Sequence, residues 1–581
     1  MRSALPGLRR GAVSGTPAGV KRALGAWCGV LVLAFASAAD GTAAVSPNAS
    51  LTADQHASRF LAQATFGPTT ESIAELRQSG NNYSAWIDRE AAKAQTKAVD
   101  VLVAERNAGR ITTSDRALNR RARTQVMLTA PDQLRQRVAY ALSQIMVVSD
   151  ADSNVQNGGD GSSSYWDMLA RNALGNFKTL MMDVTQHPIM GRYLSHYKNR
   201  KANSATGTRP DENYAREVMQ LFTIGLYQLD ASGNYIFDGG GRPLETYTND
   251  NITEFARVFT GFTDASTNNT GTGTGRTDFP SATQNYTDPM RLWEGQHDTG
   301  AKTLLSYPGA RKVNLPAGQT GLQDVSDALD NLIEHPSTAP FISRQLIQRL
   351  VTSNPSDGYV GRVAAVFVNN GAGVRGDLLA VVKAILLDHE ARNTALLTDP
   401  QHGKLREPFL RVTHVLRAFK FVNSSANPIP YDLGGFTENT MGQFPLGSPS
   451  VFNFYSPDYE PPGPISDAAL VGPEFQILNA VFAITLPNTF NTLISGANGT
   501  GSFRLNLAEQ ETFASNTGAL LDNLNLLLTH GTMSPESRAA ILRAVDGITA
   551  AMVPGTSTLN QQRARLALQL TLLSPDYAVL K

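Results

Sequence analysis

The sequence predicts a mainly α-helical protein, built as one large multi-helix globular domain with a small β excursion and long loops. Apolar residues recur at intervals of three and four along most of the chain, which is the helical period. Glycine is plentiful, at 49 residues, and indicates many loops. The length of 581 residues allows a large core. We expect residues 45–581 to form this domain, with 265–300 as the place of any further division.

The helical segments follow from this periodicity in chain order. The first pattern extends from Ala57 to Gln95, with turn residues inside it. Turn residues at 230–241 predict the β excursion, and Asn251 with Glu254 predicts a capping box. The later helices are predicted at Leu134–Val148, Tyr165–Met182, from Pro188 to about Tyr197, Arg209–Leu226, from Thr248 onward, Leu322–His335, Phe341–Thr352, Val360–Asn370, Asp377–His389, Leu405–Phe421 and Leu566–Leu580.

Residues 1–44 are predicted to be a signal peptide and linker. Basic residues precede an apolar run, Leu24–Phe35, which ends in the small residues Ala36, Ser37 and Ala38. This run is shorter than the ~20 residues that cross a bilayer. We therefore expect an exported protein, periplasmic or extracellular, with no membrane span in the mature chain. The single cysteine, Cys28, would be removed with the signal, which leaves no disulfide.

The charge balance argues against polyanionic partners. Lysine and arginine together number 50, and aspartate and glutamate also number 50, so the formal net charge is zero. A nucleic-acid-binding protein usually carries a basic excess. We therefore expect no nucleic-acid partner.

The segment Arg209–Leu226 concentrates polar groups on one helix face. Tyr214, Val218 and Phe222 recur at the helical period and predict a buried stripe. We interpret the other face either as a site or as a salt-bridged surface, because glutamate and arginine four residues apart commonly form structural pairs. That face holds Glu212, Asn213, Arg216, Glu217 and Gln220.

A short link joins this helix to the one before it. His196, Asn199 and Arg200 lie near the end of the preceding helix. If the two helices form a hairpin, these three residues approach Glu217 and its neighbours.

The segment Gly295–Thr303 superficially resembles a phosphate-binding loop. Its lysine is displaced by one residue and no apolar strand precedes it, so nucleotide binding is not favoured. His297, Asp298 and Lys302 remain as candidate site residues. Surface placement explains them equally well.

Three other segments attract attention. The loop Asp150–Asp160 offers oxygen ligands, but Val155 and Gly161 stand where an EF-hand needs glycine and glutamate, so a flexible polar loop is favoured. The basic run Arg116–Arg123 is better explained as a solvated face than as an anion site. Phe444–Gly463 is rich in proline and aromatic residues, and packing over the core is favoured over stacking on a sugar or peptide.

The most distinctive stretches of the chain are Arg209–Gly225, Glu254–Phe262, His297–Thr303 and Ser448–Tyr455. Together they resemble the bacterial family catalogued as domain of unknown function 1800, from about Ala57 to the C-terminus. The resemblance implies an exported, mainly helical protein. It also implies a partner from the sulfatase-like family called domain of unknown function 1501, but it supplies no reaction, metal or cofactor.

Two functions fit the sequence, which contains no Gly-x-Ser-x-Gly elbow, no His-Glu-x-x-His helix and no Walker loop. The first is a hydrolase that acts on an extracellular or periplasmic polymer or an anionic substrate. In it, Glu217 is the general base or a metal ligand, and a histidine shuttles a proton. The candidate catalytic residues are Glu217, His196, His297 and Asp298, and the candidate substrate-binding residues are Asn213, Arg216, Arg200 and Lys302.

The second function is a non-catalytic binding protein, or a partner of the sulfatase-like neighbour. The loops Asp264–Thr287 and Phe444–Gly463 would then be contact surfaces. A buried Glu217 with a raised pKa in a polar pocket favours the enzyme, and a well-solvated Glu217 favours the binder.

Overall fold

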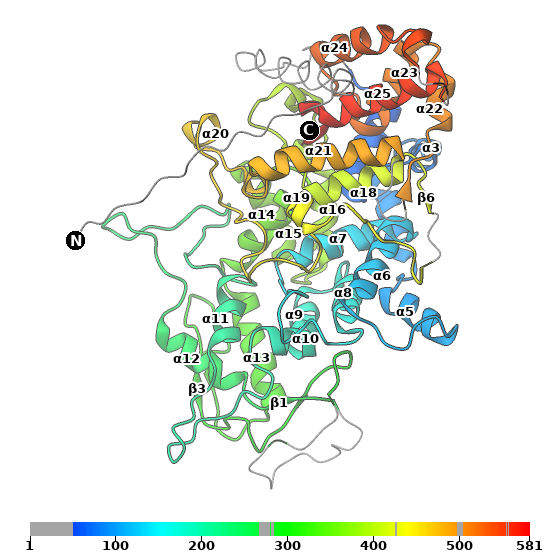
Figure 1. Ribbon diagram of the computed structural model, residues 1–581. Helices are drawn as coiled ribbons and strands as arrows, with labels where there is room; N and C mark the ends of the chain where they lie inside the picture. Colours follow the sequence, from blue (N-terminus) through cyan, green and yellow to red (C-terminus); the bar gives the residue numbers. More distant parts are fainter. Residues whose placement is uncertain are drawn as a thin grey trace, which may run out of the picture. The chain divides into compact units, whose positions relative to one another are not determined.

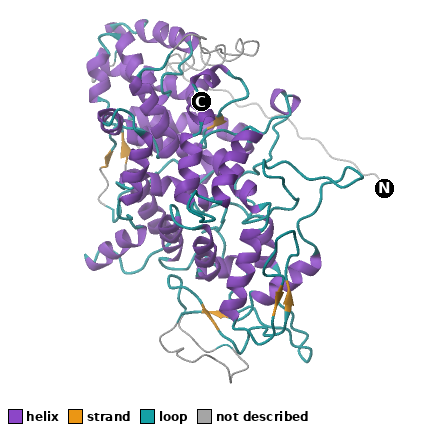
Figure 2. Ribbon diagram, turned by 180° about the vertical axis from the view of Figure 1, so that it is seen from behind, coloured by secondary structure: helices purple, strands orange, loops and turns teal. Residues whose placement is uncertain are grey.

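The computed structural model describes residues 50–265, 279, 284–423, 427–496, 503–553, 555 and 557–581. Residues Val45–Lys581 form one compact unit. Helices dominate the described chain (Figure 1), and the strands are short (Figure 2). The predicted mainly helical fold class is therefore confirmed. The predicted signal peptide, Cys28 and most of the loop Asp264–Thr287 lie outside the described residues.

The first helices begin where the sequence supplies capping side chains. Thr52, Thr69 and Asn82 each accept a hydrogen bond from the backbone N–H three residues later. His187 caps the helix that Pro188 begins, as the sequence predicts. The elements are α2 (Ala53–Ala64), α3 (Thr70–Gln78), α4 (Tyr83–Ala92), α5 (Ala98–Asn107), α6 (Arg116–Thr129), α7 (Gln133–Ser143), α8 (Gly161–Asn172), α9 (Phe177–Gln186) and α10 (Pro188–Tyr193).

The prediction of one helix over Tyr165–Met182 is wrong. Helix α8 ends at Asn172, and α9 begins only at Phe177. The break contains Gly175 and Asn176, and the Asn176 side chain accepts a hydrogen bond from the Lys178 N–H and so starts a new helix. Local capping therefore outweighs the continuous apolar period.

The central part of the chain contains α11 (Asn213–Gln220), α12 (Asn249–Val258), β1 (Phe262–Thr263), β2 (Arg291–Leu292), β3 (Lys302–Thr303), β4 (Asn314–Leu315) and α13 (Gly321–Glu334). Strand β1 pairs antiparallel with β2, and β3 with β4. The predicted β excursion is an arm, residues 226–246, in which three segments pair through the bridges Tyr227 with Glu245, Leu229 with Tyr235 and Phe237 with Pro243. Helix α11 is shorter than predicted at both ends.

The remaining elements are α14 (Thr338–Leu350), α15 (Asp357–Val368), α16 (Leu378–Leu387), α17 (His389–Arg392), β5 (Lys404–Leu405), α18 (Pro408–Ala418), β6 (Val422–Asn423), α19 (Glu438–Met441), α20 (Pro464–Asp467), α21 (Ala480–Ser495), β7 (Phe503–Arg504), α22 (Ala508–Phe513), α23 (Thr517–Leu528), α24 (Pro535–Asp546), α25 (Leu559–Leu573), α26 (Pro575–Ala578) and β8 (Val579–Leu580), with the 3-10 helices η1 (Thr394–Thr398), η2 (Pro473–Gln476) and η3 (Ala550–Met552). Helix α14 packs on α15 and α15 on α16, while α21 packs on α19 and α25 (Figure 1). Strand β5 pairs antiparallel with β8, and β6 with β7. Among the described helices, none has both the length and the apolar character needed to cross a membrane.

A buried ionic cluster joins several of these elements. The Lys404 ammonium lies 2.8 Å from a carboxylate oxygen of Glu474 and 4.0 Å from one of Glu407. It also donates to the backbone carbonyls of Gln348 and Arg349 in α14. All three charged side chains are almost completely buried. Because a buried charge is costly unless it is paired, this cluster fixes β5, α14 and η2 relative to one another.

The Glu407 carboxylate is the acceptor at the centre of this cluster. It accepts hydrogen bonds from the Tyr140 hydroxyl, at 2.6 Å, from Gln443 Nε2, also at 2.6 Å, and from Gln144 Nε2. Burial favours the protonated acid, but the Lys404 charge and these hydrogen bonds outweigh it and lower the pKa of Glu407. Glu407 therefore remains an ionised structural group in the core.

Replacing Glu407 with alanine tests this assignment. The change leaves Lys404 with one carboxylate and leaves buried donors unpaired, so we expect the free energy of unfolding to fall by about 3–5 kcal/mol in urea titrations. The control is Glu71→Ala, which removes an exposed ion pair with Lys420 and should cost less than about 1 kcal/mol. A similar small loss for both variants would contradict a structural role for the cluster.

Candidate functional site

The polar face of α11 divides between the surface and the interior. Glu212 and Asn213 are exposed, and Arg216 lies 3.9 Å from Glu212 in a half-exposed ion pair. Such a pair contributes little to stability. Glu217, by contrast, is only 5% exposed, and its Oε2 has no hydrogen-bond partner among the described residues. Burial raises the pKa of Glu217, and the Arg216 charge offsets part of that rise.

His196 is a core residue. Its ring lies 4.0 Å from the Tyr214 ring, centroid to centroid, and its Nε2 donates to the Thr185 carbonyl at 2.8 Å. Burial lowers the pKa of His196 to about 4, so the ring is neutral near pH 7. The predicted hairpin does bring Asn199 to Asp211, which exchange two hydrogen bonds. No contact joins the His196 ring to Glu217 among the described residues.

His297 and Lys302 meet at a carboxylate that the sequence did not single out. His297 Nε2 lies 3.0 Å from Asp324 Oδ2, and the Lys302 ammonium lies 2.5 Å from the same oxygen. All three side chains are buried. The ammonium already neutralises the carboxylate, so the arrangement is that of a buried ion pair with a histidine attached.

Asp298 lies beside this triad, because its backbone carbonyl accepts a hydrogen bond from the Lys302 ammonium, whereas its side chain has other partners. Asp298 accepts two hydrogen bonds from Arg257 and one from the Gly300 N–H. Burial favours the protonated Asp298, but Arg257 outweighs this effect and lowers its pKa. Arg200 is exposed, with its guanidinium 5.4 Å from the centre of the Phe279 ring. The predicted site residues therefore occupy several separate places.

A cavity with a volume of about 730 Å³ lies elsewhere in the described chain. Its walls come from segments far apart in sequence: the loop 149–153, the end of α10, the loop 447–450 and the segment 476–482. We call it the cleft. Two contacts fix its walls, because the Asp150 N–H donates to the Leu446 carbonyl at 2.7 Å and the Ser149 hydroxyl donates to the Ser448 carbonyl, also at 2.7 Å.

Three arginines of α6 anchor one edge of the cleft. Arg116, Arg120 and Arg123 follow at spacings of four and three, so they share a helix face. Each contacts the buried carboxylate of Asp150, at 2.8 to 2.9 Å, and Arg116 and Arg120 also contact Glu438. Burial raises the pKa of Asp150, but the arginines outweigh burial and lower it. The basic run is therefore a partly buried ion-pair network rather than a solvated face.

Tyr193 stands in the wall of the cleft. Its pKa is raised to about 12, mainly by burial and with smaller contributions from the charges of Asp152 and Glu217, while a hydrogen bond with Ser448 acts in the opposite direction. Asp152 also lines the cleft and makes no ion pair with any described residue. Tyr193 thus remains protonated near neutral pH, and two carboxylates from distant segments contribute to its raised pKa.

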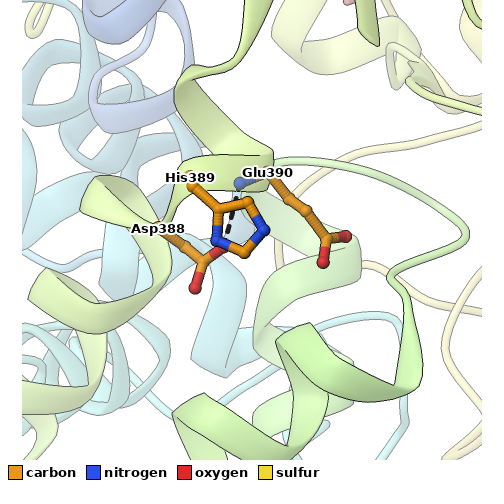
Figure 3. Close-up of side chains that lie close together, drawn as sticks. All are labelled: Asp388, His389 and Glu390. Atoms are coloured by element: carbon orange, nitrogen blue, oxygen red, sulfur yellow. Dashed lines mark hydrogen bonds and ion pairs between the residues drawn. The ribbon is translucent and has the colours of Figure 1, made fainter.

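One group of three adjacent metal-ligating side chains occurs in the described chain. The ligating atoms of Asp388, His389 and Glu390 lie within 4.8 Å of one another (Figure 3). Arg362, however, binds Asp388 at 2.8 and 2.9 Å and Glu390 at 3.1 Å. Figure 3 shows the Glu390 carboxylate pointing away from Asp388. A guanidinium already pairs with both carboxylates, so we interpret the group as the capped start of α17.

A comparison with protein-family models gives one result for this chain. The model described as "Protein of unknown function (DUF1800)" matches residues 59–579, nearly the whole chain. The chain belongs to this family. The resemblance drawn from the sequence is thereby confirmed. No curated protein and no solved structure matches the chain.

Within this DUF1800 chain, sequence reasoning missed the residues that build the cleft. The sequence predicts Tyr193 only as part of a helix from Pro188 to about Tyr197, and Asp152 only as part of a polar loop. The available signal was the distinctive segment Ser448–Tyr455, whose first residues line the cleft. Nothing in the sequence indicated that this segment contacts Ser149, because about 300 residues separate them.

We predict that Asp324→Asn destabilises the fold without a specific loss of function. The substitution leaves Lys302 and His297 buried without a carboxylate, so the free energy of unfolding should fall by about 3–5 kcal/mol in urea titrations. Asp298→Asn, which affects a half-buried pair with Arg257, serves as the milder control. Unchanged stability combined with a loss of activity would instead assign a chemical role to the triad.

The histidines predict how stability depends on pH. The pKa of His196 falls from 6.5 to about 4 on folding, so the unfolded state binds more protons between these values. The free energy of unfolding should therefore fall as the pH drops from about 6.5 to about 4, with His196 contributing up to about 3 kcal/mol. Urea titrations at pH 7 and pH 5 measure this fall.

His196→Gln should make that fall smaller. The matched control is His389→Gln, since His389 is exposed. An equal pH dependence in the wild type and in His196→Gln would contradict the assignment of His196 as a neutral core residue.

Proposed function

We propose that the protein is an exported hydrolase that cleaves a polymer in the periplasm or outside the cell, with the cleft as its active site. The observation that carries the proposal is Tyr193 in the cleft wall, influenced by Asp152 on one segment and by the buried Glu217 on another. A titratable group in a cavity wall whose pKa is strongly shifted is typical of a functional site.

The roles follow from the two environments. Glu217 is buried and its pKa is raised, so it holds a proton more readily than an ordinary glutamate and suits the general acid. Asp152 faces the cleft without an ion-pair partner among the described residues and suits the general base that activates water. Tyr193 stays protonated and can donate a hydrogen bond to the substrate or pass on a proton. The proposal gives His196, His297, Asp298 and Lys302 structural roles.

A second candidate function is a non-catalytic role as a partner of a co-exported sulfatase-like protein of the domain of unknown function 1501 family. The observation in its favour is the arm, residues 226–246. Exposed apolar side chains are common singly but rarely gather on one short segment. Those on the arm are Leu226, Tyr227, Tyr235, Ile236 and Phe237.

The test of the hydrolase uses the mature protein purified from the exported fraction, whose N-terminus is determined by mass spectrometry. The protein is assayed against polymeric and chromogenic glycoside, ester, peptide and phosphate substrates. Glu217→Gln and Asp152→Asn should each lower kcat/KM by about 10²–10⁴-fold, because each removes one proton-transfer group. Glu212→Gln, on the exposed face of the same helix, should retain full activity.

Two outcomes would contradict the proposal. Full activity in Glu217→Gln would remove the cleft pair from the mechanism. A folded wild type without turnover in all four substrate classes would favour the partner function instead. In that case, Phe237→Ser in the arm should abolish co-purification with the sulfatase-like protein.

A further inference from the structure

The cleft has a lining that selects its ligand, and this inference rests on the proposed function because it concerns the same cavity. We propose that the cleft binds an uncharged carbohydrate chain, and that the bond cleaved is glycosidic. Three features of the lining carry the proposal: its charge, its hydrogen-bonding groups and its aromatic wall.

The charge of the lining disfavours anionic ligands. The charged side chains that line the cleft are Arg116, Asp152 and Glu438. Arg116 is already bound to Asp150 at 2.9 Å and to Glu438 at 3.1 Å. Asp152, which lines the cleft, makes no ion pair with any described residue. A sulfate, phosphate or uronate group would therefore meet carboxylates without an unpaired cation to compensate.

The neutral polar groups of the lining suit hydroxyl-rich ligands. Asn479 uses its Oδ1 to cap α21, and Gln476 uses its Oε1 to accept from the Ser456 N–H. These hydrogen bonds to the amide oxygens fix the orientation of both side chains, so their amide N–H groups are donors with a fixed direction. The hydroxyls of Ser450, Ser153 and Tyr193 also line the cleft and can both donate and accept. Sugar hydroxyls need this mixture of donors and acceptors.

Part of the lining is apolar and partly aromatic. Phe454, Ile477 and Phe482 contribute to it. Gly442 has a φ of +74°, and a Cβ at this position would lie 2.6 Å from the Phe482 ring, so the glycine lets that ring pack closely against the chain. An aromatic ring that is supported on one side and borders a cavity on the other can stack on the C–H face of a sugar ring.

The volume fits a chain rather than a single small group. Ligand pockets of roughly 300–1,000 Å³ enclose most of a drug-sized molecule. A cleft of about 730 Å³ falls within this range. A short run of sugar residues can place hydroxyls on the polar lining groups and a C–H face on Phe482.

Hydrolysis of a glycosidic bond balances with water and the side chains that we propose as acid and base. A water oxygen forms a bond to the anomeric carbon and gives one proton to Asp152. The bond between the anomeric carbon and the glycosidic oxygen breaks, and that oxygen receives a proton from the Tyr193 hydroxyl, which lines the cleft and takes a proton in turn from Glu217. Water is the only co-reactant, and the products are a free reducing end and an alcohol. Two carboxyl groups in different environments are what this reaction requires.

The test is isothermal titration calorimetry on the mature protein with uncharged hexasaccharides: cellohexaose, chitohexaose and maltohexaose. Hexagalacturonate serves as the anionic counterpart. At least one neutral hexasaccharide should bind, and hexagalacturonate should bind at least about tenfold more weakly. Phe482→Ala should weaken the neutral binding about tenfold, because it removes the stacking ring. Val481→Ala is the matched control, because this neighbouring side chain is 58% exposed and does not line the cleft.

Ser450→Ala, at an exposed position, supplies a second variant if Phe482→Ala fails to fold, and it should also weaken neutral binding. New reducing ends are measured in the same samples. Binding without new reducing ends would keep the ligand class and overturn the hydrolase. Glu217-dependent cleavage of an ester, peptide or phosphate without hexasaccharide binding would keep the hydrolase and overturn the ligand class. Tighter binding of hexagalacturonate, or equal effects of Phe482→Ala and Val481→Ala, would also overturn the ligand class.

Discussion

The buried Lys404 ammonium, held by Glu407 and Glu474, is the interaction on which the arrangement of the cleft depends. Its carboxylate and carbonyl partners belong to η2, α14 and the residue just before α18. The cluster continues to Gln144, which accepts a hydrogen bond from the Tyr455 hydroxyl at 3.3 Å. Tyr455 ends the segment that begins with Ser448 in the cleft wall. Because each charge would be costly alone, the core has one acceptable arrangement, and that arrangement places the cleft wall.

A second ionic cluster, centred on Asp150, lies beside the cleft. Asp150 is held by three guanidinium groups, and its neighbour Asp152 is thereby presented to the cavity without being neutralised itself. The same arrangement saturates Arg116, which explains why an arginine-rich helix edges a cavity that carries no free cation among its described lining residues. Structural and chemical carboxylates thus lie two residues apart and differ only in what surrounds them.

Much of the fold could be predicted because helix formation is local. The prediction Leu322–His335 falls within one residue of α13 at each end, because Thr320 and the apolar period mark the helix in sequence. The site could not be predicted in this way. Asp324 lies in that same correctly predicted helix, yet its contact with Lys302 depends on how α13 packs. Likewise, the sequence offers no link between the basic run Arg116–Arg123 and the polar loop Asp150–Asp160. Only the tertiary structure brings Arg123 to Asp150.

Distinctive sequence is therefore not equivalent to a site. The segments Glu254–Phe262 and His297–Thr303 contact each other through Arg257 with Asp298 and through Thr260 with His297. Gly261, with a φ of +95°, leaves room there, since a Cβ would lie 2.9 Å from the Trp293 carbonyl oxygen. These contacts account for the polar residues of both segments as demands of packing. Ser448–Tyr455 differs, because only part of it contacts the ionic core and its first residues face the cavity. Where a segment satisfies the core at one end and leaves polar groups facing a cavity at the other, packing accounts for the first end, and the ligand that we propose would account for the second.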